Sequence, residues 1–87
     1  MAYTIEFRPS ARRDLKQLPR SVLSRIDEAI LRLGDNPRPP GCEKMAGRRD
    51  RYRVRVGDYR IVYEIHDMVL IVLVLQIGHR REVYRSL

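Results

Sequence analysis

The fold is decided by residues 51–65, which read RYRVRVGDYRIVYEI and alternate between charged and apolar side chains. Such alternation is typical of strands with one buried face. Gly57 and Asp58 interrupt it, and a two-residue turn at that point predicts an antiparallel hairpin in which Arg55 lies directly opposite Arg60. The face expected to pack on the rest of the protein carries Tyr52, Val54, Val56, Tyr59, Ile61 and Tyr63.

The opposite face of the hairpin carries four arginines: Arg51, Arg53, Arg55 and Arg60. Like charges that face each other across a strand pair destabilise it, so the cluster indicates a negatively charged ligand. Arginine binds phosphate through two parallel hydrogen bonds, which makes a phosphate backbone suitable. The alternative is that these charges only discourage edge-to-edge association of the sheet. Arg55 opposite Arg60 favours the phosphate interpretation.

Upstream of the hairpin, alternation predicts a strand over residues 3–7. Apolar side chains spaced three and four residues apart predict two helices, over residues 11–18 and 21–33. Ser10 is expected to cap the first helix, and Gly34 to end the second. The two helices form a hairpin with one apolar side.

A proline-rich loop over residues 35–41 separates these helices from the sheet. Residues 68–77 are apolar at nearly every position, so we expect them to form a strand inside the sheet beside residues 59–65, after a short turn at His66 and Asp67. The predicted fold is α+β with two layers. An N-terminal strand and a helical hairpin pack on an antiparallel sheet that ends in a three-strand meander.

Length and charge restrict the class of protein. The 87 residues suffice for a single domain spanning 1–87, and the formal net charge of +7 predicts a polyanionic partner. Cys42 is the only cysteine, so an internal disulfide is excluded and a cytoplasmic protein is expected. The longest apolar run, residues 68–75, is shorter than the about 20 residues that span a bilayer.

A second cluster of chemically useful residues follows the last predicted strand. Residues 78–85 read GHRREVYR and are expected to bring further groups to the end of the sheet that carries the arginines. These groups are His79, Arg80, Arg81, Tyr84 and Arg85. Arginine side chains, an imidazole and a phenol together can bind a phosphate and move a proton.

Several classes of active site are excluded by what the sequence lacks. It has no paired carboxylates on the basic face, no serine or cysteine triad, no glycine-rich phosphate loop and no metal-ligand spacing, so neither metal nor cofactor is expected. Cleavage of an RNA phosphodiester by its own 2′-hydroxyl remains possible. That reaction needs an aligned substrate, positive charge on the phosphorane oxygens and groups that move two protons.

The order of these elements, with the motifs at 51–65 and 78–84, resembles the RelE/ParE superfamily of toxins, and most of all its RelE branch. The resemblance spans essentially the whole chain. It implies the toxin of a type II toxin-antitoxin pair, which cleaves messenger RNA in the ribosomal A site without metal and leaves a 2′,3′-cyclic phosphate. The implied partners are the ribosome, messenger RNA and a RelB-like antitoxin.

The resemblance also assigns roles by position. Arg53 and Arg55 stand where the RelE branch has two basic strand residues, and Arg60 matches its phosphate-binding arginine. Arg80 and Tyr84 match its C-terminal arginine and tyrosine. The best-studied pattern has lysine at both strand positions. Arginine does not release a proton at neutral pH, so the proton-transfer role of those lysines has to be filled by another group.

Tyr84 or His79 is the expected proton-transfer group, with Tyr84 preferred because it matches the family's tyrosine. Two other functions stay open: a ParE-like inhibitor of DNA gyrase, and a noncatalytic RNA- or ribosome-binding module. The predicted catalytic residues are Arg55, Arg60, Arg80, Tyr84 and His79, and the predicted RNA- or phosphate-binding residues are Arg51, Arg53, Arg81 and Arg85.

Overall fold

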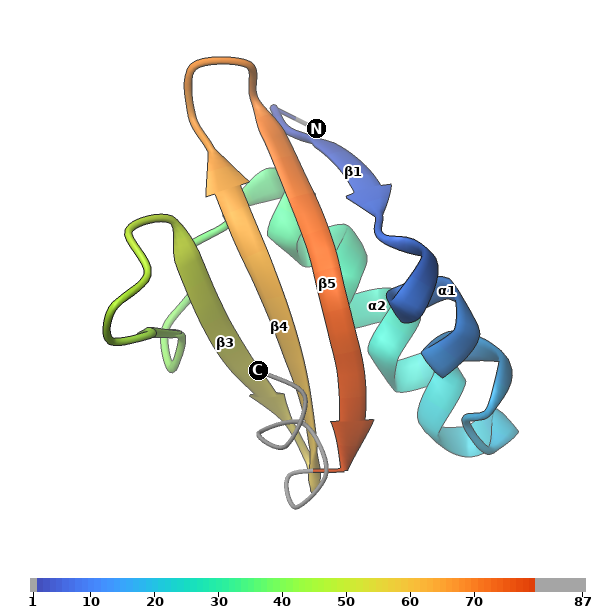
Figure 1. Ribbon diagram of the computed structural model, residues 1–87. Coiled ribbons are helices and arrows are strands. Elements are labelled where there is room, and N and C mark those ends of the chain that lie inside the picture. The colour runs from blue at the N-terminus through green and yellow to red at the C-terminus, as the bar shows by residue number, and fades with distance from the viewer. Residues whose placement is uncertain (1, 80–87) are drawn as a thin grey trace.

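Two helices cover one face of a five-stranded sheet in the computed structural model, which describes residues 2–79 (Figure 1). The helices are α1 (Pro9–Lys16) and α2 (Arg20–Asp35). The strands are β1 (Thr4–Phe7), β2 (Glu43–Lys44), β3 (Arg51–Val56), β4 (Tyr59–His66) and β5 (Ile71–His79). They lie in the order β1-β5-β4-β3-β2. The predicted two-layer α+β fold is confirmed.

The β3–β4 hairpin has the predicted register. Arg55 pairs with Arg60 and Arg51 with Glu64, across a turn at Gly57 and Asp58. Gly57 has a φ of +62°, which favours glycine, and a Cβ at this position would lie 2.8 Å from Nη2 of Arg25. The positive φ therefore explains the glycine in this turn, and the end of the Arg25 side chain lies over it.

The last strand lies inside the sheet as predicted, between β1 and β4. Two details differ from expectation. Strand β1 runs parallel to β5, so the sheet is mixed rather than antiparallel. In addition, β5 begins at Ile71 because Asp67 and the three apolar residues that follow it form a four-residue turn, with Leu70 at a φ of +56°. The side chain of Met68 is 97% exposed there. Hydrophobicity alone thus overestimated the length of the strand.

A bulge interrupts the pairing of β4 with β5. Val62 pairs with Gln76 but its neighbour Tyr63 pairs with Val74, so Leu75 is an extra residue on β5. Val62 and Leu75 are both buried, in a small cluster away from the helices. Beyond the bulge, β5 presents each side chain to the opposite face from the one that regular alternation would give.

The main core lies between the helices and the sheet. The buried residues are Ala11, Ile26, Ile30, Leu33, Ile61, Tyr63, Ile65, Val72, Val74 and Ile77. The predicted inner face of the hairpin adds to this core, because Tyr52, Val54, Val56 and Tyr59 pack against the cluster. Tyr63 is fully buried, and its hydroxyl donates a hydrogen bond of 2.7 Å to the carbonyl of Pro37, so the proline-rich loop is held to the sheet.

Both predicted helix ends need correction. Helix α1 begins at Pro9, whose ring suits the first turn, and it ends at Lys16 rather than at residue 18. Ser10 does not cap it, because its Oγ donates 2.9 Å to the carbonyl of Leu75. Gly34 does not end α2 but is buried inside it, where its carbonyl accepts a hydrogen bond from Tyr3.

Helix α1 takes over from β1 as the neighbour of β5. Strand β1 pairs with β5 only as far as Val74, and the backbone groups of β5 beyond that point are satisfied by α1. Ser10 binds the Leu75 carbonyl, and the Asp14 carboxylate accepts 2.9 Å from the Ile77 amide. These two side chains are four residues apart and share one helix face.

No helix among residues 2–79 is both long and apolar enough to cross a membrane.

Candidate phosphate-binding site

The four hairpin arginines lie on the outer face, which is the face of the sheet opposite the helices. Because side chains alternate along a strand, and Tyr52, Val54 and Val56 pack on the core, Arg51, Arg53 and Arg55 point the other way. The same argument places Arg60 and Glu64 of β4 on the outer face. The predicted separation into an apolar and a basic face is confirmed.

Two of these arginines bind carboxylates. Arg51 lies 3.0 Å from Glu64, with side chains 11% and 21% exposed, and Arg53 lies 3.2 Å from Glu43 of β2. Burial opposes ionisation of Glu64, but hydrogen bonds from Arg51 and from His66 outweigh it and hold the pKa of this carboxyl below its ordinary value. The structure therefore pairs Arg51 with Glu64 inside the sheet, and RNA binding by Arg51 stays a prediction.

Arg55 and Arg60 form the other arrangement. The carbonyl of Arg51 accepts a hydrogen bond from the amide of Met45 and so points away from β4. Backbone groups point to alternate sides along a strand, so those of Arg55 also point away from β4. The Arg55–Arg60 pair is therefore of the close, non-hydrogen-bonded type. Such pairs have Cα atoms about 4.5 Å apart. On β5 the partner of Arg60 is Gly78, which has no side chain. The Arg55–Arg60 pair therefore has no side chain beside it at this position of β5.

His79 lies on the other side of the sheet. It pairs with Tyr59, whose side chain packs on the core, and the two rings are in edge contact with centroids 5.7 Å apart. Asp14 of α1 and Gln17, which follows the helix, line the same cavity. The structure therefore separates His79 from the Arg55–Arg60 pair, contrary to the expectation that it completes the site.

The histidine that does share the outer face is His66, which the sequence gave no reason to select. Its Nε2 lies 3.0 Å from Glu64, and it is six residues from Arg60 along the same strand. Six residues of strand correspond to roughly 20 Å, so His66 is too far away to exchange protons at the arginine pair. The remaining predicted residues, Arg80, Arg81, Tyr84 and Arg85, lie outside the described residues.

The far end of the sheet carries a network of paired groups. Arg38 of the proline-rich loop binds Asp67 with two hydrogen bonds, of 2.9 and 3.3 Å, and Tyr3 donates 2.6 Å to the same carboxylate. The Arg38 guanidinium also lies over the Tyr52 ring, 5.3 Å from its centroid. Hydrogen bonds from Arg38 and then Tyr3 lower the pKa of Asp67. This network fastens the loop to the sheet.

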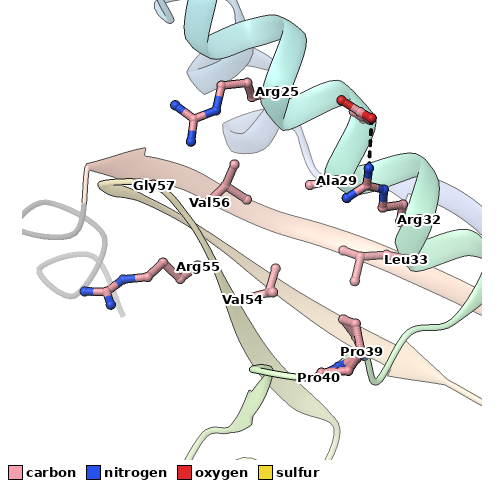
Figure 2. A pocket seen from close by; sticks show the side chains of 11 residues that line it. Arg25, Ala29, Arg32, Leu33, Pro39, Pro40, Val54, Arg55, Val56 and Gly57 are labelled. Carbon is pink, nitrogen blue, oxygen red and sulfur yellow. Dashed lines mark hydrogen bonds and ion pairs between the residues drawn. The ribbon is translucent and has the colours of Figure 1, made fainter.

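A groove of about 380 Å³ between α2 and β3 is the feature that sequence reasoning missed (Figure 2). Arg55 lies on its rim, so the groove adjoins the arginine pair. The signal in the sequence was the spacing of Arg25, Ala29 and Arg32, which places two arginines and a small residue on one side of α2. Within residues 2–79, no three histidine, cysteine, aspartate or glutamate side chains are arranged to hold a metal ion.

Comparison with known proteins gives a consistent family assignment. A family model described as the ParE toxin of the type II toxin-antitoxin system parDE matches residues 5–84. Toxin RelG of Mycobacterium tuberculosis is 36% identical, over 98% of this chain and 99% of its own. The mRNA interferase toxin RelE of Escherichia coli K12 is 28% identical, over 97% of this chain and 92% of its own.

Solved structures show the same fold. A chain of a RelBE toxin-antitoxin complex from Mycobacterium tuberculosis superposes with a TM-score of 0.78 at 32% identity, and the match covers 92% of this chain and all of that chain. A chain of the archaeal RelE-RelB complex from Pyrococcus horikoshii OT3 gives 0.82 at 26% identity, covering 94% and 99%. These toxin chains therefore share the fold of this chain.

Proposed function

This chain belongs to the family of ParE toxins of type II toxin-antitoxin systems and is RelE-like, and from that premise we propose that it cleaves messenger RNA on the ribosome. The names of its relatives support the RelE activity, since they include an mRNA interferase. The observation that carries the proposal is the Arg55–Arg60 pair beside Gly78. Two adjacent cations without side-chain bulk on the next strand suit a phosphodiester lying across the sheet.

In the proposed step the 2′-hydroxyl of the RNA attacks the adjacent phosphorus. Its proton is removed as the new P–O bond forms, the P–O5′ bond breaks, and the leaving 5′ oxygen receives a proton. The products are a 2′,3′-cyclic phosphate and a free 5′-hydroxyl. Negative charge grows on the non-bridging oxygens, where Arg55 and Arg60 stabilise it. Because guanidinium groups supply this charge, we propose that no metal ion takes part.

The other roles follow from position and stay proposals. Arg53 and Arg80 bind the RNA backbone and the leaving group, and Arg81 and Arg85 add phosphate contacts. Tyr84 takes part in one of the two proton transfers, and this choice is supported by the contact of the His79 ring with Tyr59, whose side chain packs on the core. The antitoxin partner is proposed to be RelB-like, because solved relatives are complexes with RelB. The cytoplasm is the proposed location, since the ribosome is the proposed target.

The first test is primer extension on messenger RNA taken from translating ribosomes incubated with the chain, with and without a metal chelator. We expect cuts within codons in both conditions. The name of the family model favours a second candidate, inhibition of DNA gyrase. Loss of supercoiling by purified gyrase, with the messenger RNA intact, would transfer the chain to that activity. If the chain binds ribosomes but neither cleaves messenger RNA nor inhibits gyrase, it is a noncatalytic binding module.

The second test separates the two proton-transfer groups by single-turnover cleavage on preformed ribosome complexes between about pH 5.5 and 7.5. Tyr84→Phe should remove most of the rate, because a phenyl ring has no proton to exchange. His79→Gln should retain near-normal rates and the same pH profile, since its ring contacts Tyr59 on the helix side. A flattened pH profile in His79→Gln would return the imidazole to the active site.

A further inference from the structure

The bulge on β5 determines which side chains border the arginine pair. Val72 and Val74 belong to the main core, so regular alternation would direct Gln76 toward the helices as well. The extra residue at Leu75 reverses that direction. Gln76 pairs with Val62, which packs with Leu75 in the cluster away from the helices, and directly paired residues share a face. The Gln76 side chain therefore lies on the outer face, with the arginines.

Gln76 is a close neighbour of the position at which Gly78 leaves the sheet without a side chain. The two residues are separated by one residue of β5, so they share a face and lie about 7 Å apart along the strand. Gln76 is also the diagonal neighbour of Arg60, the residue that pairs with Gly78. Such neighbours are about 7–8 Å apart, within reach of a long side chain. A group bound over Gly78 is thus bordered by both Arg60 and Gln76.

The side-chain amide of Gln76 has an unsatisfied oxygen. Oε1 is buried, and no donor among residues 2–79 lies within hydrogen-bond distance of it. A buried acceptor without a donor lowers the stability of the fold, so such groups are rare in native proteins. A ligand that supplies a donor at this point of the outer face would satisfy Oε1.

The chemistry of an RNA strand restricts which of its groups can be that donor. Phosphate oxygens only accept hydrogen bonds, so a phosphate bound by Arg55 and Arg60 cannot satisfy the Gln76 oxygen. The ribose 2′-hydroxyl is both a donor and an acceptor. Its carbon is bonded to the carbon that carries the scissile phosphate, whereas the base edges are farther from the phosphorus because the sugar lies between them. A phosphate over Gly78 therefore brings a 2′-hydroxyl close to Gln76.

We propose that the side-chain oxygen of Gln76 accepts a hydrogen bond from the attacking 2′-hydroxyl of the RNA and holds this group beside the phosphorus. The inference rests on the proposed function for the reaction. An amide is not a base at neutral pH, so removal of the hydroxyl proton stays with another group. Gln76 fixes the direction of attack, and an aligned nucleophile reacts faster. The same contact distinguishes RNA from DNA, which has no 2′-hydroxyl.

The first test is single-turnover cleavage on preformed ribosome complexes by Gln76→Met, which keeps the length of the side chain and loses the amide. We expect the rate at saturating concentrations of the chain to fall about tenfold, as for the loss of one hydrogen bond, while the concentration that gives half the maximal rate changes less than threefold. Gln17→Met makes the same change at an exposed position beyond α1, on the helix side of the sheet, and should cleave at the parental rate.

Thermal unfolding of the same variants separates this role from a structural one. The melting temperature of Gln76→Met should equal or exceed that of the parent, because the substitution removes an unsatisfied buried acceptor. A side chain with a purely structural role would give the opposite result, a lower melting temperature with an unchanged rate of cleavage.

The second test measures the contact in the absence of cleavage. A messenger RNA with 2′-amino groups in its A-site codon keeps a donor at each ribose, whereas the 2′-fluoro analogue has none, and neither contains the attacking hydroxyl. The parent and Gln17→Met should bind ribosomes programmed with the amino codon at least threefold more tightly than those with the fluoro codon. Gln76→Met should bind both equally.

Four results would overturn the contact: full-rate cleavage by Gln76→Met, equal binding of both codons by the parent, no binding of either codon, or a preference for the amino codon that Gln76→Met retains. A changed codon preference with that retained preference would assign Gln76 to a base edge instead. If the chain leaves ordinary messenger RNA intact but prefers the amino codon through Gln76, the contact is supported and the proposed cleavage is overturned.

Discussion

Arg51 and Arg55 lie at opposite ends of strand β3 on the same face, yet their surroundings differ. At one end, which we call the paired end, Arg51 and His66 both bind Glu64, and the nearby Arg38 binds Asp67. At the arginine end, Arg55 faces a second arginine across the strand pair. The paired end sets opposite charges together, whereas the arginine end sets two positive charges across one strand pair, an arrangement that suits an anionic ligand.

The sharpest way to test this contrast is to remove an arginine from each end. Arg60→Ala should lower the single-turnover cleavage rate about a hundredfold, corresponding to about 3 kcal/mol of lost transition-state stabilisation. Its free energy of unfolding should fall by less than that of Arg51→Ala. Urea denaturation and ribosome binding measured on the same variant separate the effects. If binding falls as much as cleavage, Arg60 is an anchor with no catalytic part.

Arg51→Ala should show the reverse pattern. Removing this guanidinium leaves the Glu64 carboxylate, whose side chain is 21% exposed, without its main partner. Fully buried pairs broken in this way cost 3–5 kcal/mol, and the residual exposure reduces the expected loss of unfolding free energy to about 2 kcal/mol. Cleavage measured below the melting temperature should persist. Loss of cleavage without loss of stability would restore Arg51 as an RNA ligand.

Gly57→Ala tests how the arginine end is held together. The alanine must adopt a φ of +62°, and its Cβ would meet Arg25 at 2.8 Å, so we expect about 1.5 kcal/mol of destabilisation. Gly47→Ala is the matched control, because Gly47 has a φ of +76° and no atom near the added methyl. A larger loss at Gly57 measures the Arg25 contact. Equal losses in thermal unfolding would mean that Arg25 moves aside freely.

Arg55→Gln should stabilise the fold slightly while it reduces cleavage. Relieving like charges across a strand pair contributes about 0.5 kcal/mol, and the effect should shrink as salt rises. Denaturation at low and high ionic strength measures both. An unfolding free energy that falls in this variant would contradict the view that the arginine end is destabilised in favour of ligand binding.

The smallest effect concerns acid. The pKa values of Asp67 and Glu64 are lowered in the folded chain, so both groups stabilise it above their unfolded pKa values, near 4, and this contribution is lost as pH falls through the lower folded values. The free energy of unfolding should be constant between about pH 7 and 5 and should fall as the pH is lowered further. In urea denaturation, the free energy of unfolding of Asp67→Asn should fall less steeply with acid than that of the parent. If the unfolding free energies of the variant and the parent have the same dependence on pH, the Asp67 carboxylate does not stabilise the fold.

Local pattern was sufficient for the hairpin and its two faces. A two-residue turn between strictly alternating strands allows one register, so the pairing of Arg55 with Arg60 could be derived from residues 51–65 alone. The helices could be derived from their apolar spacing for the same reason. The helix ends could not, because Ser10 binds the distant strand β5 and Gly34 binds Tyr3, which precedes β1.

Only the tertiary structure decided the face on which His79 lies. Regular alternation from Ile71 would place this ring on the outer face, and the single extra residue at Leu75 reverses it. A bulge depends on how two strands fit together, and no motif in β5 announces it. The groove has the same origin, because its walls come from α2, β3 and the proline-rich loop. Sequence determined which residues are charged, and packing determined which of them can act together.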